Sequence, residues 1–97
     1  MEKKYTAFTD TLFEAILTLK SVEECYNFFE DICTVKEIQT LSQRLEVAKL
    51  LRKNKSYTEI SKETGASTAT VSRVKQSFTY GTGGYQAVLQ RLEEGEN

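Results

Sequence analysis

The sequence predicts an all-α fold of five to six helices, and three observations support this class. The 97 residues include no proline, the residue that interrupts helices most strongly. Apolar residues recur at spacings of three and four along most of the chain, which is the period of an amphipathic helix. A hydroxyl residue followed three positions later by glutamate, the capping-box pattern, marks three helix starts. This length fits one domain over residues 1–97.

Two helices are expected in the N-terminal third of the chain. The first covers about residues 6–19, where apolar residues beginning at Phe8 form a broad stripe along one side. Ser21 and Glu24 have capping-box spacing and predict the start of the second helix, which continues with helical period to Ile32. The width of the first stripe indicates that this helix packs against a partner.

A long third helix is expected to follow the capping-box pair of Thr34 and Glu37. It continues to the basic segment at residues 52–55 and keeps one face apolar. The sequence leaves open whether this helix is interrupted near Ser42. The residues of the predicted apolar face are Val35, Ile38, Leu41, Leu45, Ala48 and Leu51.

A change of pattern at Ser56 predicts two helices joined by a tight turn, over residues 56–79. Ser56 and Glu59 form a third capping-box pair, and Gly65 is suited to a turn. The second helix starts within Ser-Thr-Ala-Thr-Val-Ser-Arg at residues 67–73, where most exposed helices would carry Glu, Lys or Gln. Small side chains at a helix start allow another molecule to approach the backbone closely.

The last segment, residues 80–97, is expected to contain a linker and a C-terminal helix. Tyr-Gly-Thr-Gly-Gly-Tyr at residues 80–85 is typical of a flexible connector, because glycine restricts the backbone least. These glycines do not predict a phosphate-binding loop, since the required Lys-Ser or Lys-Thr is missing and no strand precedes them. Residues 87–92 have the spacing of one further helix.

The composition excludes several classes of function. The chain has no histidine, so Ser-His and Cys-His nucleophile pairs are excluded and the commonest zinc ligand is missing. Cys25 and Cys33 alone cannot complete a zinc tetrahedron and are expected to be reduced thiols. We therefore predict no enzyme activity, no metal and no cofactor. The sequence has no signal peptide and no run of roughly 18 apolar residues to span a membrane, so a cytoplasmic protein is expected.

Charge is distributed unevenly along the chain, although the net charge is only −1. Residues 1–34 carry three Lys or Arg against seven acidic residues, a net charge of −4. Residues 35–55 carry six Lys or Arg against two Glu, a net charge of +4, and Lys53 lies at the basic end of this segment. A local basic patch next to residues 56–79 favours an anionic partner, whereas the whole chain does not.

A helix, a glycine turn and a second helix with a hydroxyl-rich start form the arrangement that enters the major groove of DNA. Hydroxyl groups can bond to phosphates or base edges, and the Ala69 methyl can contact thymine. We therefore predict sequence-specific binding of double-stranded DNA. The residues expected to contact bases are Thr68, Ala69 and Ser72; those expected to contact phosphates are Lys53, Ser67, Thr70 and Arg73; and Ser56 and Thr58 complete the predicted DNA-binding set.

The segment from Ser56 to Arg73, Ser-Tyr-Thr-Glu-Ile-Ser-Lys-Glu-Thr-Gly-Ala-Ser-Thr-Ala-Thr-Val-Ser-Arg, resembles the helix-turn-helix of the Trp repressor. The whole chain is similar to the Trp-repressor-related proteins of the YerC/YecD type, most specifically from Leu41 to Phe78. The resemblance implies a Trp-repressor-like fold and an intertwined homodimer, with two recognition helices about one DNA turn apart. Residues 1–55 would then be the dimerisation core of a transcriptional regulator, a repressor on a palindromic operator.

The same resemblance implies a small-molecule pocket between the recognition helix and the core, formed in the family by two arginines and a serine. Arg73 and Ser77 match two of these positions, but Gln43 stands in place of the other arginine. Val74 stands in place of a glycine that leaves room for an indole, so both changes disfavour tryptophan. Arg44 is adjacent to Gln43 but about 100° around the helix. The predicted effector residues are Gln43, Arg73 and Ser77, with the effector unidentified.

Other interpretations remain open from the sequence alone. The helices around Gly65 could form a hairpin in a protein-interaction adaptor that kept the fold and lost DNA binding. The acidic N-terminal segment and a pI near 5.5 favour this adaptor hypothesis. Arg73 could pair with a surface carboxylate, as most isolated arginines do. The basic residues before Ser56 could be a solvated helix end that complements the helix dipole.

Overall fold

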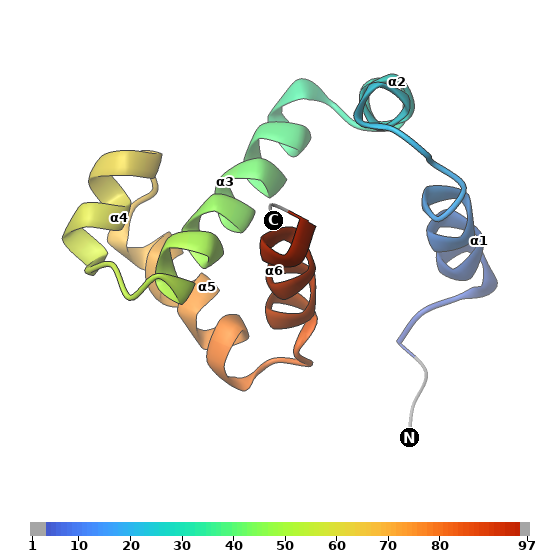
Figure 1. Ribbon diagram of the computed structural model, residues 1–97. Helices are drawn as coiled ribbons and strands as arrows, with labels where there is room; N and C mark the ends of the chain where they lie inside the picture. Colours follow the sequence, from blue (N-terminus) through green and yellow to red (C-terminus); the bar gives the residue numbers. More distant parts are fainter. Residues whose placement is uncertain (1–3, 96–97) are drawn as a thin grey trace. The chain divides into compact units, whose positions relative to one another are not determined.

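The computed structural model describes residues 4–95, which form six helices and no strand (Figure 1). The helices are α1 (Ala7–Ile16), α2 (Val22–Ile32), α3 (Val35–Arg52), α4 (Tyr57–Thr64), α5 (Thr68–Tyr80) and α6 (Gly84–Gly95). The predicted all-α class is therefore confirmed. The chain divides into an N-terminal unit that ends at Ile38 and a C-terminal unit that begins at Gln39. Over residues 4–95, no helix is long and apolar enough to cross a membrane.

Hydroxyl side chains start α2 and α3 at the predicted residues. Ser21 Oγ accepts a hydrogen bond from the Glu24 amide at 3.1 Å, so α2 begins at Val22. Thr34 and Glu37 form a reciprocal capping box. The Glu37 amide donates to Thr34 Oγ1 at 3.1 Å, and the Thr34 amide donates to Glu37 Oε1 at 2.8 Å. The hydrogen bonds from the Thr34 amide and the Thr34 side chain to the Glu37 carboxylate hold the pKa of Glu37 below its ordinary value.

The helix α1 is shorter than predicted, since it ends at Ile16 rather than Leu19. The amides of Thr18 and Leu19 donate to carbonyls three residues back, at 3.1 Å each. Thr18 Oγ1 also donates to the Ala15 carbonyl at 2.6 Å. Tight turns of this kind close a helix, because the hydroxyl competes for a carbonyl that the helical ladder would use.

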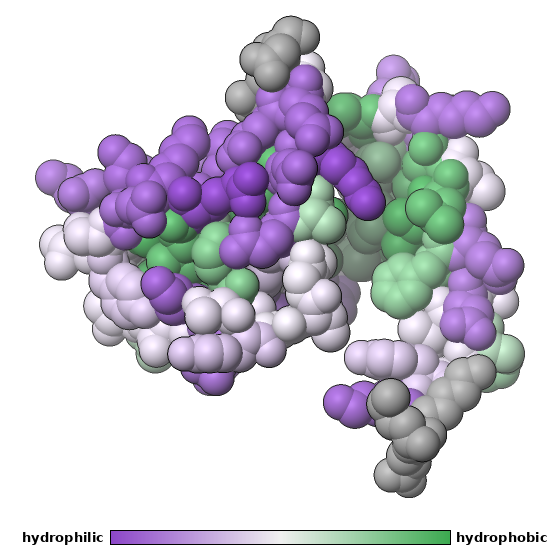
Figure 2. Space-filling view, turned by 60° about the horizontal axis from the view of Figure 1, so that its bottom comes forward, coloured by the Kyte–Doolittle hydropathy of each residue, from purple (hydrophilic) through white to green (hydrophobic). Residues whose placement is uncertain are grey.

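The N-terminal unit exposes large apolar side chains. No described residue of α1 or α2 is buried, and Phe8 and Leu17 are 87% and 83% exposed. Phe28 and Phe29 contact each other edge to face, with ring centroids 5.6 Å apart. Figure 2 shows apolar surface, in green, on this part of the chain. The large exposed apolar residues of this unit are Tyr5, Phe8, Phe13, Leu17, Val22, Tyr26, Ile32 and Val35. A surface of this kind is typical of one that another chain covers.

The C-terminal unit has a hydrophobic core in which α4, α5 and α6 surround the C-terminal half of α3 (Figure 1). Val47 of α3, Ile60 of α4 and Val71 of α5 are fully buried. The buried residues are Val47, Ala48, Leu50, Leu51, Ile60, Ala66, Val71, Val74 and Leu89. Both α4 and α5, and the turn between them, are thus attached to α3 by apolar contacts.

The apolar face predicted for α3 is partly wrong. Ala48 and Leu51 are buried as expected, but Leu41 is 49% exposed. Val47 and Leu50, which lie outside the predicted face, are buried. The difference arises because α4, α5 and α6 pack around the last turns of α3, where consecutive positions on more than one side are covered.

The helix α3 is continuous through Ser42 and ends in a Schellman motif. The amide of Lys55 donates to the Leu50 carbonyl at 3.1 Å, and that of Asn54 donates to the Leu51 carbonyl at 3.0 Å. Asn54 has φ 62, the left-handed conformation that this motif requires and that asparagine tolerates better than most residues. This end directs the chain into α4.

The linker predicted over residues 80–85 is shorter in the structure, where it covers only residues 81–83. Tyr80 is the last residue of α5, and α6 begins at Gly84, well before the predicted residues 87–92. The Gly81 amide donates to the Ser77 carbonyl at 2.9 Å and closes α5. The C-terminal helix is therefore longer, and its connection shorter, than glycine content alone predicts.

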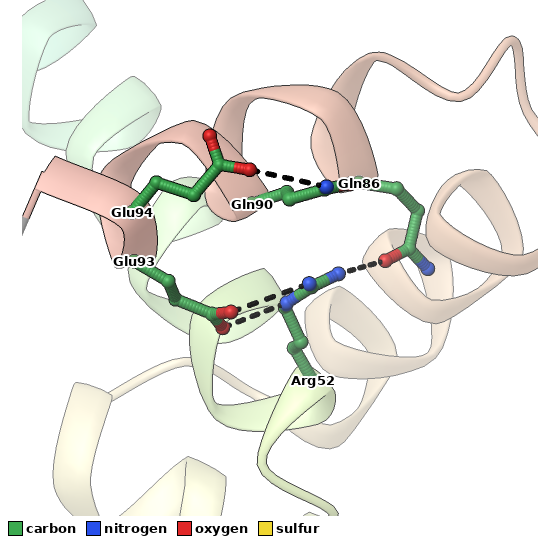
Figure 3. Close-up of polar contacts among 5 residues, drawn as sticks. All are labelled: Arg52, Gln86, Gln90, Glu93 and Glu94. Carbon is green, nitrogen blue, oxygen red and sulfur yellow. Dashed lines mark hydrogen bonds and ion pairs between the residues drawn. The ribbon is translucent and has the colours of Figure 1, made fainter.

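The side chain of Arg52 joins the end of α3 to α6 (Figure 3). Arg52 Nε lies 2.7 Å from Glu93 Oε1, Nη2 lies 3.3 Å from Glu93 Oε2, and Nη1 donates to Gln86 Oε1 at 2.7 Å. The hydrogen bonds to Glu93 raise the pKa of Arg52, and the same bonds lower the pKa of Glu93. Leu89, 2% exposed, is the buried residue of α6. Burial of Leu89, packing of Tyr85 against the core and the polar contacts of Arg52 therefore hold α6 in place.

Candidate nucleic-acid interface

The helix-turn-helix consists of α4, a turn at residues 65–67 and α5. Gly65 ends α4 with φ 75, a left-handed conformation that glycine adopts without steric cost. The Gly65 amide donates to the Ser61 carbonyl at 2.9 Å, and the Ala66 amide donates to Thr64 Oγ1 at 3.1 Å. Ala66 is 4% exposed. Local hydrogen bonds and the burial of one methyl group thus fix the turn.

Ser67 is the N-cap of α5 and forms hydrogen bonds with Thr70. Ser67 Oγ accepts from the Thr70 amide at 3.1 Å and donates to Thr70 Oγ1 at 3.1 Å. Both residues were predicted to contact phosphates. In the free protein their hydroxyls hold the helix start, and the hydroxyl hydrogen of Thr70 is left to reach another acceptor. The first turn of α5 has no acidic residue, so no carboxylate opposes the positive end of the helix dipole.

Most of the α5 side chains predicted to face DNA are exposed, whereas Thr70 is half-buried. Thr68, Ala69, Ser72 and Arg73 are all exposed, while Val71 between them is fully buried in the core. The helix therefore presents its small and hydroxyl side chains to solvent and its β-branched apolar side chains to α3. This orientation leaves the start of α5 accessible to a groove of DNA.

The predicted contacts before α5 lie at the end of α3 and the start of α4. Lys53, Ser56 and Thr58 are exposed. Ser56 Oγ accepts from the Glu59 amide at 3.2 Å as the N-cap of α4. Lys55 Nζ lies 3.9 Å from a carboxylate oxygen of Glu59, a long surface pair that DNA phosphates could replace. Arg52, which also precedes Ser56, differs from Lys53 because its guanidinium is hydrogen-bonded to Glu93 and Gln86 of α6.

A pocket of about 270 Å³ lies between α3, α5 and the start of α6. The predicted effector residues Gln43, Arg73 and Ser77 all line it, so the structure brings them together. Gln43 Nε2 donates to the Thr64 carbonyl at 3.2 Å. Within residues 4–95, Arg73 has no carboxylate at ion-pair distance. The lining residues are Thr40, Gln43, Arg44, Thr70, Arg73, Val74, Ser77 and Tyr85.

Four of these lining residues, Thr40, Arg44, Thr70 and Tyr85, were not predicted to be part of the pocket, and Thr70 was predicted as a phosphate contact instead. Thr40 precedes Gln43 by three positions on α3, a spacing that places both on one side of a helix and could have identified it. Arg44 contributes to the wall despite its offset from Gln43. Tyr85 belongs to α6, although residue 85 was predicted to lie in the linker, and no local signal in the sequence indicates its role.

A helix-turn-helix that exposes small and hydroxyl side chains beside a basic helix end defines the class of helix-turn-helix DNA-binding regulators. The chain belongs to the Trp repressor protein family, whose sequence model matches residues 8–93. This family has a regulatory DNA-binding fold and is not a family of enzymes.

Similar proteins support the same assignment. The chain is 56% identical over 87 residues to the uncharacterized protein YerC of Bacillus subtilis (strain 168), which covers 90% of this chain and 84% of YerC. A TrpR-like protein from Eubacterium eligens ATCC 27750 is 55% identical, with a TM-score of 0.89 and 91% of each chain covered. A Staphylococcus aureus structure, described as a proposed Trp repressor, is 54% identical with a TM-score of 0.89, covering 92% of this chain and 89% of that one.

Proposed function

We propose that this protein is a cytoplasmic transcriptional regulator that binds a palindromic operator as a homodimer and represses by occluding it. The observation that carries the proposal is the set of exposed small and hydroxyl side chains at the start of α5, Thr68, Ala69 and Ser72, on a helix-turn-helix with a left-handed glycine in its turn. Membership of a family of DNA-binding regulators supports it.

In the proposed complex, the bases are contacted by Thr68, Ala69 and Ser72. Their short side chains bring the helix backbone close to the floor of the major groove, where hydroxyls bond to base edges and a methyl contacts thymine. The proposed phosphate contacts fix register and orientation rather than sequence. These contacts are Lys53, Ser67, Thr70 and Arg73, and Ser56 and Thr58 complete the proposed DNA-binding set.

The proposed dimer covers the apolar surface of the N-terminal unit. Phe8 and Leu17 are each more than four-fifths exposed in the single chain, a costly arrangement in water. A second copy supplies a matching apolar surface, because a two-fold axis pairs the same residues on both chains. We propose that residues 1–55 form the dimerisation core of a single domain, with 56–79 as the helix-turn-helix and 80–97 as the linker and C-terminal helix.

We propose that operator binding does not require tryptophan. Val74 is 4% exposed and is part of the core, so its side chain occupies volume beside the pocket. Gln43 offers a neutral amide rather than a cation, and the amide is already bonded to the Thr64 carbonyl. A small-molecule effector of another kind would use Gln43, Arg73 and Ser77.

The test is selection of bound sequences from a random duplex library, with and without L-tryptophan. The expected result is a palindrome with half-sites about one helical turn apart, enriched equally in both conditions. Enrichment only with tryptophan would overturn the statement on the effector. Failure to enrich any sequence at low salt, together with passage through a polyanion column, would favour the adaptor hypothesis over DNA binding.

A further inference from the structure

A side-chain amide on α3 is bonded to the turn of the helix-turn-helix. Gln43 Nε2 donates to the carbonyl of Thr64 at 3.2 Å, and the contact is partly buried. Thr64 is the last residue of α4 and directly precedes Gly65. The last carbonyls of a helix have no partner within the helix, and one left unpaired away from water is costly. Residue 43 thus supplies a partner from an element 21 residues away.

This bond differs in kind from the apolar contacts between α3 and the helix-turn-helix. Val47, Ile60 and Val71 hold the two parts together through apolar burial, which depends on area and has no direction. A hydrogen bond prefers an angle above about 150° at the hydrogen and weakens steeply below about 120°. The Gln43 amide therefore favours one tilt of the turn on α3 among those that the apolar core would accept.

We infer that Gln43 is a positioning residue that fixes the orientation of α5 on α3 for DNA binding. The inference rests on the proposed function, since it concerns how the recognition helix is held. The donor belongs to the chain itself, so the orientation is set without a bound molecule. Gln43 and Arg73 both line the pocket, so the Gln43 amide lies where α3 faces α5.

The first test compares Gln43→Met with a matched control, Gln90→Met. Methionine keeps the length and helix propensity of glutamine but has no donor. Gln90 lies exposed on α6, where its amide donates to Glu94 at 3.3 Å, so the control loses an amide bond of the same type far from the turn. The measured quantity is the affinity for the selected duplex divided by that for a scrambled duplex.

Loss of one ordinary hydrogen bond corresponds to a factor of about five, so this ratio is expected to fall about fivefold in Gln43→Met. Affinity for the scrambled duplex is expected to stay within about twofold of wild type, because phosphate contacts tolerate small tilts. A ratio equal to that of Gln90→Met would overturn the inference. If Gln43→Met does not fold, Gln43→Glu provides the test, since it keeps the shape and lacks the donor when ionised.

The second test uses the free protein and does not depend on DNA binding. Amide hydrogen exchange at Gly65 and Ala66 is expected to be about fivefold faster in Gln43→Met than in Gln90→Met. Unchanged exchange at both amides would show that Gln43 does not hold the turn. If wild type selects no DNA sequence but exchange changes as expected, then the proposed function fails while the bond to the turn stands.

Discussion

Replacing Phe8 by alanine distinguishes a dimeric from a monomeric protein, because the expected change in stability has opposite signs in the two cases. Phe8 is 87% exposed in the single chain. A phenylalanine buries at least about 150 Å² when covered, so burial by a second copy contributes about 4 kcal/mol per side chain at 25 cal/mol per Å². A symmetric dimer loses this contribution twice. In a monomer the same change is neutral or stabilising, because alanine favours the helix by about 0.5 kcal/mol.

The assay is sedimentation equilibrium, combined with thermal unfolding at two protein concentrations. Wild type is expected to sediment as a dimer, with a midpoint that rises with concentration. Phe8→Ala is expected to weaken dimerisation by several powers of ten and to lower the midpoint. Glu14→Ala, an exposed change on α1, serves as the control and is expected to leave the mass unchanged. A Phe8→Ala chain with unchanged mass and an equal or higher midpoint would refute the dimer argument.

Three further predictions concern DNA contacts and the C-terminal helix. The double change Thr68→Ala and Ser72→Ala should lower the affinity for the selected duplex more than the affinity for an unrelated duplex. If a binding titration shows that both affinities fall by the same factor, Thr68 and Ser72 do not contact bases. Lys53→Gln should weaken all duplexes alike and reduce the slope of log affinity against log salt by about one, whereas an unchanged slope would exclude a phosphate contact. Glu93→Gln should lower the thermal midpoint at neutral pH by breaking the pair with Arg52. The pKa of Glu93 is lowered by folding, so the pair contributes above the ordinary value of 4.5 and is lost as pH falls through the lowered value. A difference from wild type that persisted in acid would contradict this assignment.

Local signals predicted much of the fold. Ser21 and Glu24 predicted the start of α2, and the helical period predicted its end at Ile32. Gly65 predicted the turn after α4, and the structure shows the residue in the left-handed conformation that glycine adopts freely. Signals of this kind depend on a few neighbouring residues, and the structure follows them closely.

Features that depend on distant residues could not be predicted. Arg52 was predicted to belong to a basic segment at a helix end. In the structure its guanidinium donates to Glu93, which lies 41 residues further along the chain. The buried positions of α3 depend on three helices that pack around its last turns. Tyr85 lines the pocket because α6 packs beside α3, an arrangement that local sequence does not indicate. The single-domain assignment and the individual DNA contacts stay predictions.

Because the side chains at the start of α5 are short, the backbone of α5 must be positioned accurately relative to DNA. Serine and threonine have one rotatable bond to their hydroxyl, so ordering them on DNA costs little conformational entropy, but they cannot extend to correct a misplaced backbone. The 13 residues of α5 span about 20 Å, and a rotation of about 3° about one end displaces the other by about 1 Å. Such a shift exceeds the half-ångström range of good hydrogen-bond distances. A lysine or arginine could absorb it through several torsions, whereas this surface relies on a rigid scaffold for its discrimination.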